Sequence, residues 1–170
     1  MFKEEMTRAE YLDLLKASAN KLDRFLTPDY SDELLNFCPD IEDAWTIKEH
    51  LVHILDVEVI LYLWIRMAVA ESGSKVWDIG PIIQGDWNTH INYSNQPLGN
   101  SVEAFKRIRL LIHHLLKGKV NSDWSNFFII RSNGKKWTLD KMLRILVSHL
   151  DRHLDDFINR NEKLCREQRK

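Results

Sequence analysis

Hydrophobic residues recur at intervals of three and four residues along most of the chain, which is the spacing of amphipathic α-helices. This pattern predicts four helices, over residues 7–26, 46–71, 101–117 and 138–161. Each predicted helix is several turns long and has one apolar face that must be buried against the others. We therefore expect an all-α fold, a four-helix bundle that forms a single domain over residues 1–170.

The predicted starts of the helices carry residues that commonly cap helices. Thr46 is a candidate N-cap, and Glu49, three residues later, can complete a capping box with it. Ser101 and Thr138 are candidate N-caps of the third and fourth helices. The charged segment after Leu164 is expected to fray beyond the end of the fourth helix.

Two connections between the predicted helices are more than simple turns. Residues 72–100 are long enough to run back along the second helix. The second and third helices can therefore run parallel, with the first and fourth antiparallel to their neighbours. In residues 127–137, Asn133-Gly134 lies beside a run of strand-forming residues, which predicts a small β-hairpin before the fourth helix.

The amino-acid composition disfavours some kinds of binding partner and indicates where in the cell the protein is located. The 24 basic and 25 acidic side chains nearly cancel, so no net positive field favours nucleic acid, and we expect no such partner. Residues 51–70 form the most hydrophobic run, but several ionisable side chains interrupt it, which indicates a buried helix and no membrane partner. Residues 1–8 do not resemble a secretory leader, and Cys38 and Cys165 lie far apart. We therefore expect a cytoplasmic protein with two free thiols.

Two of the seven histidines lie on the apolar face of the predicted fourth helix. On that face Leu146, His149, His153 and Phe157 follow one another at steps of three and four residues. Two imidazoles at positions i and i+4 are neighbours on a helix and can share one metal ion.

The predicted second helix carries His50, His53, Asp56 and Glu58 within an otherwise apolar run. Buried polar groups cost free energy unless they find partners. The histidines and carboxylates of these two helices can satisfy one another most simply around a cation. The spacing alone leaves open the alternative that they are hydrogen-bonded core residues without a metal.

Several sharper motifs are absent from the sequence. His149 is not followed by the Glu of the zincin metalloproteases, and the carboxylate-rich pattern of di-iron bundles is missing. No glycine-rich phosphate-binding loop occurs. His113 and His114 are adjacent near the end of the third helix, where they suit the negative end of its dipole. His90 is either a loop residue or a lid contact.

Three segments together resemble the DinB/YfiT-like metalloenzyme superfamily. The second helix begins with Trp45-Thr46, and His53 follows eight residues after the Trp, ahead of Asp56 and Glu58. Asp86-Trp87 and the residues that follow are similar to the superfamily's crossover before the third helix. The last helix begins at Trp137-Thr138-Leu139 and carries His149 and His153. The order and spacing of these matches extend over most of the chain.

The resemblance implies a four-helix bundle with an up-down-down-up arrangement and a divalent metal ion, Zn²⁺ or Ni²⁺. Carried over position by position, the ligands are His53, His149 and His153. His50 aligns with no ligand and is expected to be a polar neighbour of the site. Activities in this superfamily include transfer and isomerisation that use low-molecular-weight thiols.

A three-histidine site with an open position can bind water for hydrolysis, or a thiol as thiolate for S-transfer. We therefore expect a metal-dependent hydrolase or transferase that acts on a small molecule. Asp56 and Glu58 are candidate catalytic residues, as base or as partners of a ligand imidazole, although either can instead pair with a nearby Arg or Lys. The main alternative is a non-catalytic metal- or ligand-binding bundle, with a homodimer left open. A haem-binding bundle is disfavoured because no groove of small residues is evident.

Overall fold

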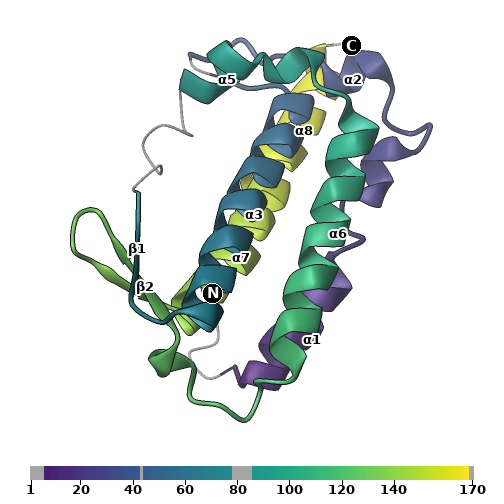
Figure 1. The fold of residues 1–170 in the computed structure, drawn as a ribbon. Helices are drawn as coiled ribbons and strands as arrows, with labels where there is room; N and C mark the ends of the chain where they lie inside the picture. The colour runs from purple at the N-terminus through teal and green to yellow at the C-terminus, as the bar shows by residue number, and fades with distance from the viewer. Residues whose placement is uncertain (1–5, 43, 78–85, 169–170) are drawn as a thin grey trace.

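The computed structural model describes residues 6–42, 44–77 and 86–168. Four long helical segments pack side by side, with a small sheet at one end and short helices at the other (Figure 1). The long helices are α1 (Arg8–Ser18), α3 (Ile47–Ala70), α6 (Leu98–Lys117) and α7 (Leu139–Arg152). This arrangement confirms the prediction of a mainly helical bundle.

The fourth helix continues beyond α7 through two further elements. The first is η4 (His153–Ile158), a π-helix, and the second is α8 (Asn159–Gln168). The prediction that the segment after Leu164 frays was wrong over the described residues, because Cys165 is buried and joins a hydrophobic cluster. Burial of this side chain holds the last turns of α8 in helical form.

Contacts along the bundle give the relative directions of its helices. At one end of α1, Arg8 lies 4.0 Å from Asp140 near the start of α7. At the other end, Lys21 donates to Asp151 in the last turn of α7 at 2.7 Å. These contacts show that α1 and α7 run in the same direction.

The ends of α3 meet the opposite ends of α7. His53 near the start of α3 contacts His149 near the end of α7, whereas Trp64 near the end of α3 contacts Trp137 just before α7. These two helices therefore run antiparallel. Figure 1 shows α6 beside α3 and running in the same direction as α3.

The start of α3 confirms the capping box read from the sequence. The Thr46 side chain accepts from the Glu49 amide at 3.1 Å, and the Glu49 carboxylate accepts from the Thr46 amide at 2.8 Å. Thr138 likewise caps α7 as predicted. The third helix instead begins at Leu98, with Pro97 at the cap position. Ser101 lies inside its first turn, so the prediction that Ser101 caps this helix was wrong.

The predicted hairpin is present as β2 (Phe128–Arg131) and β3 (Lys136–Thr138), which pair antiparallel. At its turn Gly134 has φ +77°, a left-handed conformation that glycine adopts without a steric penalty. The sequence analysis missed β1 (Ser74–Val76), which pairs parallel with β2 and completes a three-stranded sheet.

Shorter helical pieces connect the long helices. The first predicted helix ends at Ser18, where the Ser18 hydroxyl donates to the Leu15 carbonyl, and a 3₁₀ turn follows it. The remaining pieces are η1 (Asp23–Leu26), α2 (Asp32–Leu35), α5 (Asp86–Ile91), η2 (Tyr93–Asn95) and η3 (Trp124–Asn126). Of these, α5 and η2 belong to the long connection between α3 and α6.

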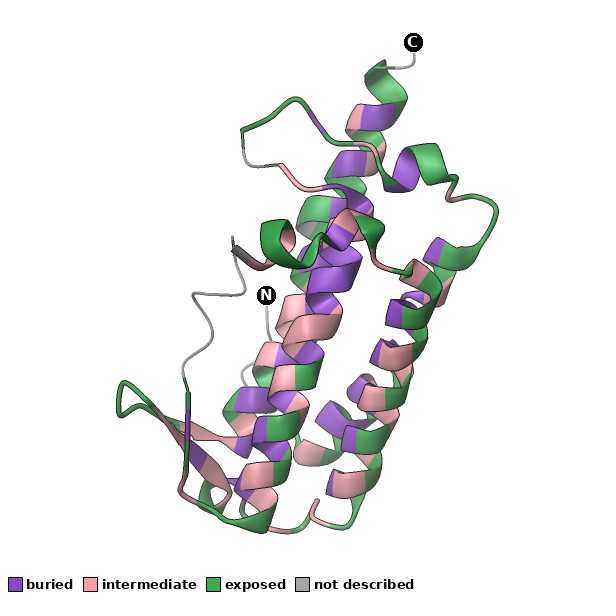
Figure 2. Ribbon diagram, turned by 45° about the horizontal axis from the view of Figure 1, so that its top comes forward, coloured by how far each residue is buried: buried purple, intermediate pink, exposed green. Residues whose placement is uncertain are grey.

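The buried residues face the interior of the bundle along each helix, as Figure 2 shows. They form two hydrophobic clusters, one near the sheet and one toward the opposite end. The second cluster contains Ile54, Leu150 and Leu154. Because these are chain neighbours of His53, His149 and His153, the cluster packs behind the histidines and fixes their backbones.

Two further findings concern the cysteines and the hydrophobicity of the helices. Cys38 and Cys165 are both free thiols, as predicted. Among the described residues, none of the helices is both long enough and apolar enough to span a lipid bilayer.

Candidate metal centre

Three imidazole rings from two antiparallel helices meet at one point. His53 comes from α3, His149 from the last turn of α7 and His153 from the first position of η4. His149 Nε2 lies 3.3 Å from His53 Nε2 and 3.1 Å from His153 Nε2. One ligand atom from each ring lies within 4.8 Å of the other two.

This donor set fits a small divalent cation. Two nitrogens that are each about 2.1 Å from one tetrahedral Zn²⁺ lie about 3.4 Å apart, which is close to the two measured separations. A neutral imidazole has one N–H and one lone pair, so hydrogen bonds among three Nε2 atoms that meet at one point leave at least one of them without a partner of its own. A cation at the common point would satisfy all three lone pairs together.

The electrostatics of the cluster keep these rings neutral. Burial lowers the pKa of His53 to about 4, and burial together with the neighbouring His53 lowers the pKa of His149 to about 3. Burial, then the charges of the surrounding histidines and Arg152, lower the pKa of His153 to about 2. The rings are therefore unprotonated at neutral pH, which is the form that coordinates metals.

A fourth histidine, His50 of α3, contacts the cluster. His50 Nδ1 lies 3.1 Å from His153 Nδ1, and burial lowers the pKa of His50 to about 4. The His50 ring stacks on Phe157, with centroids 5.0 Å apart and an interplanar angle of 23°. His50 thus faces the nitrogen of His153 that points away from the other two ligand candidates.

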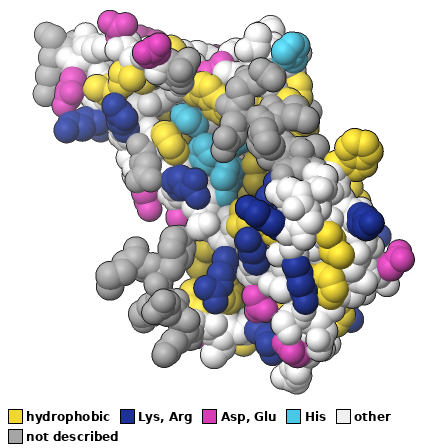
Figure 3. All heavy atoms as spheres, turned by 90° about the vertical axis from the view of Figure 1, so that its left-hand side faces the viewer, with side chains coloured by type: hydrophobic (Ala, Val, Ile, Leu, Met, Phe, Trp, Pro, Cys, Tyr) yellow, Lys and Arg dark blue, Asp and Glu magenta, His cyan; other side chains and the backbone are white. Residues whose placement is uncertain are grey.

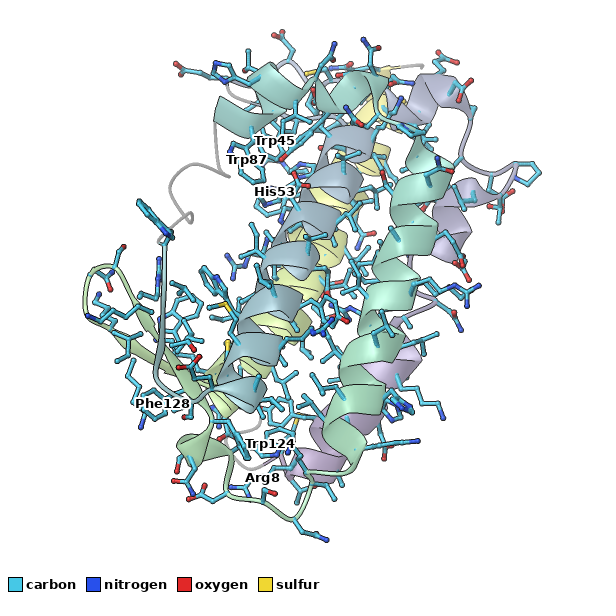
Figure 4. The ribbon with its side chains drawn as sticks, in the orientation of Figure 1. Arg8, Trp45, His53, Trp87, Trp124 and Phe128 are labelled. Atoms are coloured by element: carbon cyan, nitrogen blue, oxygen red, sulfur yellow. The ribbon has the colours of Figure 1, made fainter. Side chains whose placement is uncertain are left out.

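The three histidines lie in the wall of an open cleft of about 840 Å³. Trp45, Asn88, Thr89, Arg152, Phe157, Arg160 and Asn161 are among its other lining residues. In Figure 3, histidine side chains gather in a hollow in the middle of one face of the molecule. Figure 4 shows Trp45, Trp87 and His53 together on one side of the bundle, near the start of α3.

The π-helix shapes the far wall of this cleft. It begins at His153, and its wider turn changes the direction in which the following residues point compared with a continuous α-helix. Phe157, which the α-helical pattern placed on the buried face, is 36% exposed and lines the cleft. The Asn161 amide donates to the Trp45 carbonyl at 2.7 Å and so ties α8 to the start of α3.

Asp56 contacts the long connection between α3 and α6 and does not contact a ligand histidine. Its carboxylate accepts from the Tyr93 hydroxyl at 2.5 Å, and burial raises the pKa of Asp56 despite this hydrogen bond. His53 Nδ1 is buried and has no hydrogen-bond partner among the described residues. The structure therefore does not bring Asp56 to the ring of His53. A second bond, from Ser94 to Glu49 at 2.9 Å, holds the same connection on α3.

Glu58 lies in the interior, away from the cleft-lining residues. Its carboxylate accepts from Arg109 Nε at 2.8 Å and from Arg109 Nη2 at 2.5 Å. Arg109 also donates to the Ser18 hydroxyl and to the Leu146 carbonyl. Burial raises the pKa of Glu58, and the guanidinium charge offsets part of that rise. The structure does not bring Glu58 to the histidines, and gives it a partner on α6.

The remaining histidines lie outside the cleft wall. His90 is exposed on α5, and His113 and His114 are in the last part of α6. The sequence analysis missed Arg152 and Arg160. A signal for Arg152 was available, because it stands between His149 and His153 on the same helix.

Comparisons with known proteins give the family and the fold of the chain. Residues 5–156 match the family model of the DinB superfamily. The structure resembles YfiT from Bacillus subtilis, described as a probable metal-dependent hydrolase with an unusual four-helix bundle topology. That match has a TM-score of 0.78 at 15% sequence identity, and covers 99% of this chain and 93% of YfiT. A comparison with curated protein sequences gives no match. The family match extends over most of the chain and confirms the resemblance seen in the sequence: the chain belongs to the DinB superfamily.

Proposed function

We propose that this protein is a divalent-metal-dependent hydrolase of a small molecule, with His53, His149 and His153 as the metal ligands. The observation that carries the proposal is the convergence of three neutral imidazole nitrogens in the wall of an open cleft. A site with three protein ligands and access to solvent is typical of catalytic metal centres, whereas structural zinc sites are closed by four protein ligands.

The chemistry of the donors favours Zn²⁺ or Ni²⁺. Imidazole suits both metals, whereas Mg²⁺ and Ca²⁺ prefer oxygen ligands. Such an ion would act as a Lewis acid and lower the pKa of a coordinated water toward about 7, which supplies a nucleophile at neutral pH. The description of YfiT as a probable metal-dependent hydrolase supports the same reaction class.

We assign His50 the role of a positioning residue for His153. If His153 uses Nε2 as a ligand, its proton is on Nδ1, which then donates to His50 Nδ1. Partners of this kind fix the tautomer and the orientation of a ligand ring. The Asp56–Tyr93 and Ser94–Glu49 hydrogen bonds hold η2 on α3, next to the segment that carries Asn88 and Thr89.

Thiol S-transfer is the second reaction that this site can support. A low-molecular-weight thiol can take the coordination position of water as its thiolate, because a metal lowers the pKa of a thiol. Both reactions need the same three histidines, so the identity of the nucleophile must come from experiment. A non-catalytic metal-binding bundle is the remaining alternative.

The test is an activity screen with purified protein, freed of metal and reloaded with Zn²⁺ or Ni²⁺. The substrates are small esters, amides and phosphoesters, and electrophiles offered together with glutathione or cysteine. We expect turnover by the loaded wild-type protein, no turnover by His53→Ala, and full turnover by His114→Ala, an exposed histidine on α6 that serves as the control.

Turnover that requires an added thiol would replace hydrolysis by thiol transfer. Stoichiometric metal binding without turnover in any arm would favour the non-catalytic bundle. Equal turnover by wild-type protein and by His53→Ala would contradict the proposed site.

A further inference from the structure

Two arginines of the cleft differ from the other described arginines. Each of the others has a carboxylate, a hydroxyl or an aromatic ring within interaction distance. Arg152 and Arg160 have no such partner among the described residues, and both line the cleft. Their charges are therefore available to a ligand.

The position of Arg152 relates it directly to the histidines. It lies in the last turn of α7, three residues after His149 and next to His153. Its side chain and both of these rings line the same cleft. Arg160 lies two turns further along, in α8, and lines the same cleft.

Basic side chains outnumber acidic ones among the described residues that line the cleft. Arg152 and Arg160 line it together with one described carboxylate, that of Glu42. A bound divalent cation would add to this positive charge without any compensating ligand charge, because all three proposed ligands are neutral imidazoles. In Figure 3, basic side chains lie close to the histidines on the same face. A cleft lined by charges of one sign concentrates ligands of the opposite sign.

We propose that the substrate carries an anionic oxygen group, a carboxylate or a phosphate, which Arg152 and Arg160 bind. This inference rests on the proposed function, since it names the substrate class of the same site. The planar guanidinium binds either group through paired N–H···O hydrogen bonds. Arg152 would hold the anion beside the histidines, and Arg160 would engage it from α8. A cleft of about 840 Å³ has room for a small molecule of this kind.

The test is a titration of inorganic phosphate and, separately, of succinate, followed by NMR chemical-shift changes. Wild-type protein is compared with Arg152→Gln, Arg160→Gln and the double variant, each with and without Zn²⁺. Arg107→Gln is the matched control, because Arg107 is exposed on α6 and pairs with Glu103. Substitution of exposed arginines leaves the fold intact, which the melting temperature checks.

We expect each single substitution to weaken binding about threefold and the double substitution to weaken it about tenfold, with no change for Arg107→Gln. The probe that binds more tightly to the wild-type protein identifies carboxylate or phosphate as the preferred group. Wild-type protein that binds neither probe, or a double variant that binds both as tightly as wild type, would overturn the proposal.

The metal-free arm separates this inference from the proposed function. If the histidines bind no metal, the arginine effect is still measured in the metal-free protein. If an anion binds only with Zn²⁺ present and the arginine substitutions do not weaken it, the anion contacts the metal alone, and the inference fails while the metal site stands.

Discussion

Two groups of polar side chains lie between helices of the bundle, and they differ in charge balance and in access to solvent. The Glu58–Arg109 pair links α3 to α6 and reaches Ser18 at the end of α1 and the Leu146 carbonyl of α7. It is closed off, since Arg109 is 0% and Glu58 2% exposed. The histidine cluster also joins α3 to α7, but its members are all of one type and lie in the wall of a cleft.

The comparison separates a structural network from a candidate functional one. Glu58 and Arg109 neutralise each other's charge and are closed off from solvent, so the pair needs no ligand, although Glu58 Oε2 has no hydrogen-bond partner among the described residues. A neutral imidazole has one N–H and one lone pair, and three nitrogens that meet at one point leave at least one of them without a hydrogen-bond partner of its own within the group. A polar cluster that its own members cannot satisfy, and that a ligand can reach, is the stronger candidate for a binding site.

The largest expected effect on stability comes from breaking the Glu58–Arg109 pair. Glu58→Leu leaves a buried guanidinium without its counter-charge, and we expect a loss of about 3–5 kcal/mol in the free energy of unfolding. Urea denaturation of the metal-free protein measures this loss.

A double variant, Glu58→Leu with Arg109→Met, serves as the control, because replacing both charges with apolar groups is often close to neutral. We expect it to recover most of the lost stability. A single variant as stable as the wild-type protein would show that the pair is not structural.

The next effect falls on metal affinity. His153→Ala removes one of the three proposed ligands. Loss of a hydrogen-bond partner of a ligand typically weakens metal binding about 10–100-fold, and we expect the loss of a ligand itself to weaken Zn²⁺ binding by more than this. Competition with a chromophoric chelator measures the affinity. The exposed His114→Ala is the control and should bind as wild type. Full metal occupancy of His153→Ala would remove His153 from the ligand set.

A smaller loss of metal affinity is expected for His50→Ala. It removes the acceptor for His153 Nδ1 while leaving the three proposed ligands in place, so Zn²⁺ affinity should fall about 10–100-fold at unchanged stoichiometry. The tautomer of His153 is read from its ¹⁵N chemical shifts. We expect the imidazole ¹⁵N signals of zinc-loaded wild-type protein to show the proton on Nδ1. An unchanged affinity in His50→Ala would show that His50 only packs against Phe157.

The smallest effect tests the local structure at the histidine end of α3. Thr46→Ala removes the cap that accepts from Glu49, and we expect a loss of about 1 kcal/mol in the free energy of unfolding. Metal affinity should stay within the error of the measurement, because the cap does not contact the ligand rings. A large loss of affinity would mean that the frayed first turn of α3 controls His53.

Features set by local sequence were the ones that could be predicted. Apolar periodicity and the Thr46 capping box placed the limits of α3 within one residue, because both act within a few positions along the chain. Asn133-Gly134 predicted the hairpin for the same reason. By contrast, β1 is three residues long and gains its structure by pairing with a distant strand, so no local signal marks it.

In the candidate site, too, the features that could be predicted were those set by residues close together in the sequence. The i, i+4 spacing of His149 and His153 showed that their rings are neighbours, and the family resemblance added His53. The sequence analysis missed the partner of Glu58, although Arg109 lies on the buried face of α6, four residues after Phe105 and three before Ile112. Arg160 depends on the π-helix after His153, whose wider turn has no clear sequence signal.

The most direct test of the account is a crystal structure of the protein grown with Zn²⁺, with anomalous diffraction recorded at the zinc absorption edge. We predict one strong anomalous peak per chain, at bonding distance from Nε2 of His53, His149 and His153. The absence of a peak between these three rings, or a peak elsewhere on the protein, would contradict the central claim.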